Sequence, residues 1–150
     1  MATRRIVTIP NPILREKARE VEEFDESLAQ LLDDMRETMF KANGVGLAAP
    51  QVGILKRVAV VCTDGETVHE LVNPVITKQS GSVIGPEGCL SVPGRQGDVA
   101  RPKRITVVAQ DRNGKKKTYQ LSGFTAVAFC HEIDHLDGTI YIDKVIGDLL

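Results

Sequence analysis

Cysteine is scarce in this sequence, and long apolar runs are absent. The 150 residues include only three cysteines, and no two of them form a CxxC pair, which argues against a disulfide framework and fits a reducing compartment. No apolar run reaches the roughly 18 residues that a membrane-spanning helix requires. The apolar stretch at positions 6–9 ends at a proline and is too short for a secretory signal. We therefore expect a cytoplasmic protein without a membrane partner.

An excess of one charge sign is absent as well. The chain has 19 Lys and Arg against 20 Asp and Glu, a formal net charge of −1, so we expect no direct nucleic-acid specificity. The lysines at 115–117 stand beside a predicted turn and are interpreted as a solvated strand end. The length and the apolar share of 42% are typical of a globular protein with one core, and we expect a single catalytic domain over residues 1–150.

Apolar periodicity predicts a helix near each end of the chain and strands between them. One helix is expected over 25–43, where leucines and methionines recur at intervals of three and four, and another over 124–137, closed by Gly138. Strands are expected at 57–62, 68–76, 104–110 and 117–121. Pro74 favours an edge or a bulge in the second of these, and residues 111–114 form a hairpin turn between the last two. This order predicts an α+β fold, with largely antiparallel sheets around a central metal-binding helix.

Two glycine- and proline-rich segments interrupt this pattern. "GVGLAAPQVG" covers 44–53 and "GPEGCLSVPG" covers 85–94. Both are expected to be irregular, with a backbone that can closely approach another molecule.

The second predicted helix contains "CHEIDH", residues 130–135. On a helical projection, His131 and His135 share one apolar stripe with Glu132 at its edge, and the helix is apolar around most of its circumference, so it should be buried. Each unsatisfied nitrogen of a buried imidazole costs roughly 1–3 kcal/mol. Two core histidines bonded to the backbone would satisfy this demand, but the H-E-x-x-H spacing favours a shared metal ion. Glu132 cannot readily reach the same ion and is positioned to accept a proton from a metal-bound water.

The third metal ligand must come from elsewhere in the chain. A carboxylate from a further helix, as in many zinc peptidases, would have to lie within 136–150, which has no second histidine. His69 alternates with apolar neighbours and is expected to face solvent, Cys62 is expected in the core, and Cys130 points about 100° away from His131. Cys89 remains, beside Gly88 in the second irregular segment. With the two histidines it would form a Cys-His₂ site with an open fourth position.

Three motifs together resemble those of the peptide deformylase family. They are "GVGLAAPQ", "EGCLSVPG" and "HEIDHLDG", in the family's order and at similar separations, and the similarity extends over nearly the whole chain. The family removes the formyl group from the N-terminal formylmethionine of newly made polypeptides. The resemblance implies that Cys89, His131 and His135 bind one divalent metal ion per chain, with Fe(II) expected and Zn, Ni or Co able to substitute.

The resemblance also implies roles for residues around the metal. Glu132 would act as general base and then as general acid, and the Gln51 side-chain amide and the Leu90 backbone N–H would form an oxyanion hole. The expected substrate-binding residues are Gly44, Val45, Gly46, Phe124, Val127 and Ala128. For Phe124, a plain core position is an equal alternative. The residues expected to support the ligands are Asp134 and Arg101 as an ion pair, joined by Glu87.

Some features depart from the family or leave alternatives open. Cys130 stands where the family often has Gln, and we expect no effect on the chemistry. The expected partners are N-formylmethionyl nascent polypeptides and the ribosome near its exit tunnel, although the short segment after Val145 makes docking through a C-terminal helix doubtful. A metallopeptidase that cuts internal peptide bonds and a structural metal-binding module are the competing hypotheses. Glu132 and Gln51 discriminate against the structural site, which needs neither.

Overall fold

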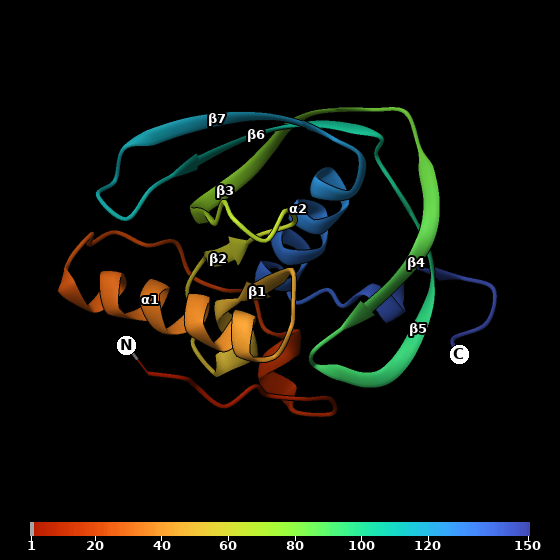
Figure 1. Cartoon of the computed structure of the whole chain (residues 1–150), viewed down its shortest axis with the longest axis horizontal. Coiled ribbons are helices and arrows are strands. Elements are labelled where there is room, and N and C mark those ends of the chain that lie inside the picture. Colours follow the sequence, from red (N-terminus) through yellow and green to blue (C-terminus); the bar gives the residue numbers. More distant parts are fainter. Residues whose placement is uncertain (1) are drawn as a thin grey trace.

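The computed structural model describes residues 2–150, so residue 1 of the expected domain lies outside the described residues. Two α-helices and eight strands follow one another along the chain (Figure 1). The helices are α1 (Glu26–Lys41) and α2 (Gly123–Leu136), with short 3-10 helices at Pro12–Arg15, Ala49–Val52 and Tyr141–Asp143. The strands are β1 (Gly46–Ala48), β2 (Val58–Val61), β3 (His69–Ser80), β4 (Val83–Cys89), β5 (Val92–Arg101), β6 (Arg104–Gln110), β7 (Lys116–Ser122) and β8 (Val145–Ile146).

The strands form two antiparallel sheets. One has five strands in the order β1-β2-β3-β6-β7, and the other has three in the order β4-β5-β8. In Figure 1, α2 lies among the strands, while α1 lies on the outside beside β1 and β2. The predicted α+β class with antiparallel sheets around a central helix is therefore confirmed.

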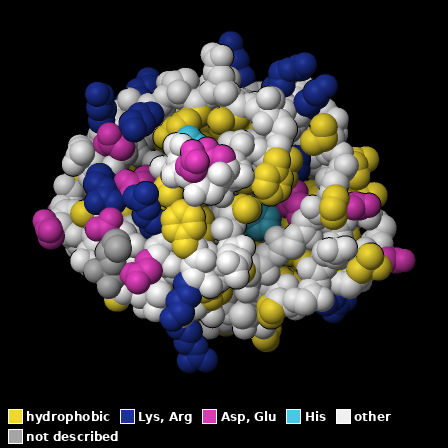
Figure 2. All heavy atoms as spheres, viewed as in Figure 1, with side chains coloured by type: hydrophobic (Ala, Val, Ile, Leu, Met, Phe, Trp, Pro, Cys, Tyr) yellow, Lys and Arg dark blue, Asp and Glu magenta, His cyan; other side chains and the backbone are white. Residues whose placement is uncertain are grey.

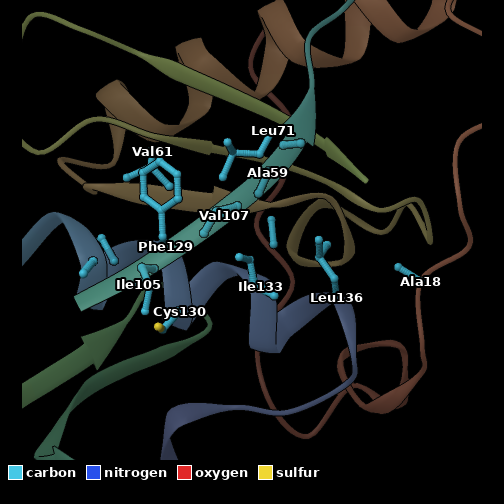
Figure 3. Close-up of a cluster of buried hydrophobic side chains, with 14 residues drawn as sticks. Ala18, Ala59, Val61, Leu71, Ile105, Val107, Phe129, Cys130, Ile133 and Leu136 are labelled. Carbon is cyan, nitrogen blue, oxygen red and sulfur yellow. The ribbon is translucent and has the colours of Figure 1, made fainter. Parts of the chain in front are cut away.

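Two packed clusters hold the helices against the first sheet. From α2, Phe129, Ile133 and Leu136 are buried against strand residues such as Leu71 and Val107 (Figure 3). The apolar stripe of α1 packs against β1, β2 and β3 in a second cluster, which includes Leu28, Leu31, Leu32, Met35, Met39, Val58 and Val60. Most residues of α2 are buried, in agreement with the predicted burial of this helix, while the side that carries Phe124, Val127 and His131 is partly exposed.

Helix ends follow the local sequence signals. The Asp25 side chain accepts a hydrogen bond from the Leu28 N–H at 3.0 Å and begins α1. Gly138 has a φ of +76° just after α2, and a side chain there would meet the Arg15 carbonyl. Thr139 N–H donates to the Asp134 carbonyl at 3.0 Å, which closes the helix as predicted for a glycine in the left-handed region.

The expectation that both glycine-rich segments are irregular was wrong in part. Residues 83–101 form the β4–β5 hairpin, and 46–48 form β1. Pro86 is tolerated because β4 is an edge strand, where a missing N–H breaks no inner ladder. The irregularity survives as a register shift between Glu87 and Cys89, which sets the local direction of the Cys89 side chain. The predicted irregularity at Pro74 is confirmed by a register shift between Val72 and Val75.

His69 also departs from its expected position. Its ring is half-buried and packs against Tyr119 and Phe129, with ring centroids 5.5 and 5.6 Å apart, rather than facing solvent. Cys62 is buried in the core, as predicted. No α-helix within residues 2–150 is long and apolar enough to cross a membrane.

Candidate metal centre and active site

Helix α2 and the end of β4 bring three candidate ligands together. One ligand atom each from Cys89, His131 and His135 lies within 4.8 Å of the other two, and this is the one such cluster that residues 2–150 contain. The Cys89 Sγ is 3.3 Å from the His135 Nε2. A thiolate and two imidazoles form a donor set that divalent iron, zinc, nickel or cobalt accepts. The residues therefore fit a metal ion, and they are the three that the sequence predicted.

Cys130 lies outside this cluster. Its side chain is buried in the core with Phe129 and Ile133, and burial raises the pKa of its thiol to about 11. The residue therefore stays a neutral thiol, consistent with the expectation that it points away from His131.

A buried ionic network holds His131 from behind. His131 Nδ1 donates to Glu87 Oε1 at 3.0 Å, which leaves Nε2 free to face the cluster. Arg101 donates to both oxygens of Glu87 at 2.8 Å and to Asp134 Oδ2 at 2.6 Å. Burial alone would raise the pKa of Glu87, but the bonds from Arg101 and His131 outweigh it and lower this pKa to about 2. The expected ion pair of Arg101 with Asp134, joined by Glu87, is present.

This network predicts that Arg101→Leu is strongly destabilising. The Arg101 and Glu87 side chains are only 3% and 6% exposed. Removal of the cation therefore leaves the buried Glu87 carboxylate without its ionic partner and with only the hydrogen bond from His131, and the loss of one member of a buried pair typically costs about 3–5 kcal/mol. The free energy of unfolding from urea denaturation measures the effect. Arg15→Leu is the control, because its pair with Asp143 is exposed and should contribute at most about 1 kcal/mol. Equal effects of the two variants would contradict a special role of the buried network.

Tyr141 also contacts the candidate ligands, although no motif in the sequence points to it. Its ring stacks on that of His131, with centroids 5.9 Å apart and planes inclined by 25°. It belongs to a third core cluster against which Cys89 packs. The ring thus restrains both side chains, and the H-E-x-x-H pattern contains no signal for it.

Glu132 is buried beside the ligand cluster. The residue is only 4% exposed, and one oxygen of its carboxylate, Oε1, has no hydrogen-bond partner among the described residues. Burial raises the pKa of Glu132 to about 7, against the lowering effects of His131 and Arg101. A carboxyl group with a pKa near neutrality can both accept and donate a proton at physiological pH.

Gly46 provides the space that Glu132 occupies. An added Cβ at this position would lie 2.8 Å from Glu132 Cδ and still closer to Oε2. We predict that Gly46→Ala displaces the Glu132 carboxylate and lowers the kcat of the expected deformylation by roughly 100-fold. Misplacement of a catalytic group by about 1 Å has an effect of this size. Steady-state kinetics of the metal-loaded protein measure it. Gly85→Ala is the control, because its Cβ would meet no atom within 4 Å; a matching loss there would contradict the steric explanation.

Gln51 directs its side-chain amide toward Cys89. Its Oε1 accepts a hydrogen bond from Ala48 N–H at 2.9 Å, so Nε2 faces the site and lies 3.5 Å from Cys89 Sγ. Nε2 also donates to the Ser91 hydroxyl at 3.1 Å. Ser91 is fully buried and was not predicted as a site residue. Its place in "EGCLSVPG" was the only available sequence signal.

A pocket of about 540 Å³ opens above the cluster. All six residues expected to bind substrate line it, together with Gln51, Cys89, Leu90, His131 and Glu132, while His135 is fully buried behind them. In Figure 2, a histidine is visible in a hollow near the centre of this face, with hydrophobic side chains beside it. Phe124 is 59% exposed, so the alternative that it is a core residue is wrong. Pro86, Pro93 and Arg95 line another wall and were not predicted.

Comparisons with known proteins identify the family of the chain. The family described as "Polypeptide deformylase" matches residues 3–148. The chain is 56% identical to a peptide deformylase of Caldicellulosiruptor bescii, over 97% of this chain and 87% of the relative. It is 52% identical to a peptide deformylase of Alkaliphilus metalliredigens, over 99% of this chain and 100% of the relative.

Solved structures give the same result. A peptide deformylase from Legionella pneumophila superimposes with a TM-score of 0.94 at 42% identity, covering 97% of this chain and 88% of that one. The enzyme from Thermotoga maritima also gives 0.94, at 39% identity, with coverages of 97% and 99%. The chain therefore belongs to the peptide deformylase family, metal-dependent hydrolases that remove the formyl group from N-terminal formylmethionine.

Proposed function

We propose that the chain carries out the deformylase reaction at the Cys89–His131–His135 cluster, with these three side chains as ligands of one divalent metal ion. The observation that carries this proposal is the convergence of the three ligand atoms beside the buried, unpartnered carboxylate of Glu132. A structural metal site would have no use for such a carboxylate. The pocket above the cluster gives a substrate direct access to it.

The metal is proposed to be Fe(II). When bound, a divalent metal supplies a hydroxide nucleophile at neutral pH. The donor set is compatible with zinc, nickel and cobalt as well, because affinity alone favours the later metals and cellular supply decides occupancy. Fe(II) beside the half-buried Cys89 thiolate should make the enzyme sensitive to oxygen and peroxide.

Each polar residue of the pocket has a proposed role in the hydrolysis. Glu132 accepts the proton of the attacking water and then donates it to the departing amine, for which a pKa of about 7 is suited. Gln51 Nε2 and the Leu90 N–H donate hydrogen bonds to the formyl oxygen as it becomes negative, and each such donor is typically worth about 3–4 kcal/mol. Glu87 and Arg101 act only by holding His131 in orientation.

The pocket walls are proposed to select the first residue of the substrate. Val45 and Phe124, 40% and 59% exposed, with Val127 and Ala128, offer apolar surface for a methionine side chain. Strand β1, which contains Gly46, is an edge strand of its sheet, and β4, which ends at Cys89, is an edge strand of the other. An extended polypeptide can pair with such an unpaired edge, which would guide the formylated end toward the cluster.

Release of formate from formyl-Met-Ala-Ser tests this function. Protein prepared anaerobically under reducing conditions should yield free amine and formate from this peptide and leave acetyl-Met-Ala-Ser intact. Cleavage of internal bonds in unformylated peptides would instead support the competing metallopeptidase hypothesis. If the protein binds metal but hydrolyses neither kind of peptide, the structural metal-binding module is the only hypothesis that remains.

We propose further that the enzyme acts in the cytoplasm, close to the ribosomal exit tunnel, because its substrates are newly made polypeptides. The segment after α2 forms a 3-10 helix and β8, and Leu150 exchanges backbone hydrogen bonds with Gln96. Residues 145–150 therefore form no helix that could dock on a ribosome. Cosedimentation of the protein with ribosomes that carry formylated nascent chains tests the association.

A further inference from the structure

Charge is unevenly distributed over the first sheet. Beyond Glu70, strands β3, β6 and β7 contain no acidic residue, although acidic residues slightly outnumber basic ones in the whole chain. Lys78 lies on β3, Arg104 begins β6, and Lys103 precedes it. Dark blue side chains stand along the upper edge of the molecule in Figure 2, where Figure 1 places β6 and β7. A local positive surface therefore exists on a protein with a net charge of −1.

Lys78, Lys103 and Arg104 form what we call the basic patch. All three are exposed, and within residues 2–150 none of them is in an ion pair. By contrast, Arg101 at the end of β5 binds two carboxylates, and so does Arg112 in the turn between β6 and β7. Lys116 and Lys117 on β7 resemble the patch, because neither is in an ion pair within residues 2–150. The patch thus retains its charge for a partner outside the chain.

Backbone pairing brings the patch to one end of the sheet. Lys78 pairs with Thr106, and Ser80 pairs with Arg104, while the Lys103 N–H donates to the Ser80 carbonyl. The next strand, β7, continues these rows with Gln120 and Ser122. Cations thus alternate with hydroxyl and amide side chains over neighbouring strands.

An open groove of about 600 Å³ crosses these rows. Its lining residues are Lys78, Gln79, Ser80, Arg104, Ile105, Thr106, Gln120, Leu121 and Ser122. Arg104 and Thr106 alternate along β6 with Ile105 and Val107, which are buried in the cluster around α2. The side chains of Arg104 and Thr106 therefore lie on the face of the sheet that is turned away from the helix, and no residue of α2 lines the groove. It shares no residue with the candidate active-site pocket, and its volume is slightly larger than that pocket's 540 Å³.

Protection of a sheet edge does not explain the whole patch. Lysines commonly prevent unpaired edge strands from associating, and this reason covers Lys116 and Lys117 on β7, the last strand of the sheet. Arg104, however, lies on β6, which is paired with β3 on one side and β7 on the other. Edge protection therefore does not account for the exposed charge of Arg104.

We propose that the groove with its basic patch binds the phosphodiester backbone of RNA. Guanidinium, ammonium, hydroxyl and amide donors are the groups that contact nucleic-acid phosphates and sugars without reading sequence. An anionic membrane fits less well, because the lining exposes no aromatic side chain for insertion between lipids and is hollowed rather than flat. The choice of RNA rests on the proposed function, since polypeptides that carry formylmethionine emerge from an RNA-rich particle.

Fluorescence anisotropy with a labelled single-stranded 20-nucleotide RNA of mixed sequence tests this proposal on the metal-loaded protein. We expect a Kd of about 1–100 μM near physiological salt, typical of binding that is not sequence-specific. Three phosphate contacts should make the affinity fall by about 20-fold between 50 and 200 mM KCl. The variant Lys78→Glu/Lys103→Glu/Arg104→Glu should bind at least about tenfold more weakly and lose most of this salt dependence.

The matched control is Lys17→Glu/Lys41→Glu/Lys56→Glu. These lysines are also exposed, and none of them is in an ion pair within the part of the chain that the structure describes. The two triple variants have the same net charge. It should keep the salt-dependent RNA binding, and both variants should deformylate short peptides normally. Equal loss in both triple variants, no RNA binding by the unchanged protein, or patch-dependent binding to phosphatidylglycerol vesicles in its place would overturn the proposal. Absence of peptide deformylation by the unchanged protein would count against the proposed function instead.

Discussion

Replacement of Glu132 by glutamine is expected to lower kcat by about 10²- to 10⁴-fold, the range that positioned proton transfer contributes. Glutamine keeps the shape of the side chain but cannot accept a proton from the attacking water. Because Glu132 Oε1 is buried without a partner among the described residues and Glu132 is not part of the ligand cluster, the metal content should not change. Steady-state kinetics and metal analysis of the same preparation measure both quantities.

The exposed Glu22→Gln substitution is the control for Glu132→Gln and should leave kcat unchanged. Loss of metal from the Glu132 variant would show that this carboxylate is a ligand. Unchanged turnover would show that the proton moves by another route. Either result would require a different assignment of the residue.

Replacement of Cys89 by alanine should remove the metal itself. The ligand set would fall to two imidazoles, so the loss in affinity should exceed the roughly 10- to 100-fold that removal of an outer hydrogen-bonding partner causes. Deformylation should fall together with the metal content. Competition with a chelator, followed by metal analysis, measures the affinity.

The other two cysteines provide the controls for Cys89→Ala. Cys62 and Cys130 are both buried in the core, outside the ligand cluster. Alanine at either position should retain the metal and should lower the free energy of unfolding in proportion to the cavity formed. Loss of metal in the Cys130 variant at unchanged fold would mean that the adjacent cysteine, and not Cys89, completes the site.

The metal-binding helix could be predicted from the sequence because the signals for it lie within the helix and directly after it. Periodicity places His131 and His135 on one stripe of a buried helix, and Gly138 marks its end. Cys89 is far from them in sequence, and the prediction depended on elimination of the other candidates and on the three family motifs. The spacing of residues along the chain cannot show that its sulfur lies 3.3 Å from His135.

Errors arose where long-range pairing or packing decides the outcome. Residues 85–94 have a turn-like composition, yet the pairing of β4 with β5 makes most of them strand. His69 was expected to face solvent, but the rings of Tyr119 and Phe129 cover it. Tyr141 stacks on His131 from a segment with no catalytic motif. None of these contacts can be read from neighbouring residues.

The balance of charges shows the same limitation. A net charge of −1 gives no reason to expect a strongly charged partner, whether anionic or cationic. The antiparallel pairing of β3 with β6 nevertheless places Lys78 and Arg104 at one end of a sheet whose neighbouring rows contain no carboxylate. Composition reports the sum of the charges, while the fold decides which of them remain unpaired and adjacent.

The most direct test of the catalytic assignment is a titration of metal-free protein with Co(II) under anaerobic, reducing conditions. Formate release from formyl-Met-Ala-Ser and the thiolate-to-cobalt absorption band are followed together. Activity and absorption should rise in parallel and stop at a single equivalent of metal, and Cys89→Ala should abolish both. A tightly bound metal without the thiolate band, or formate release that does not depend on metal, would contradict the assignment of Cys89, His131 and His135 as the catalytic metal site.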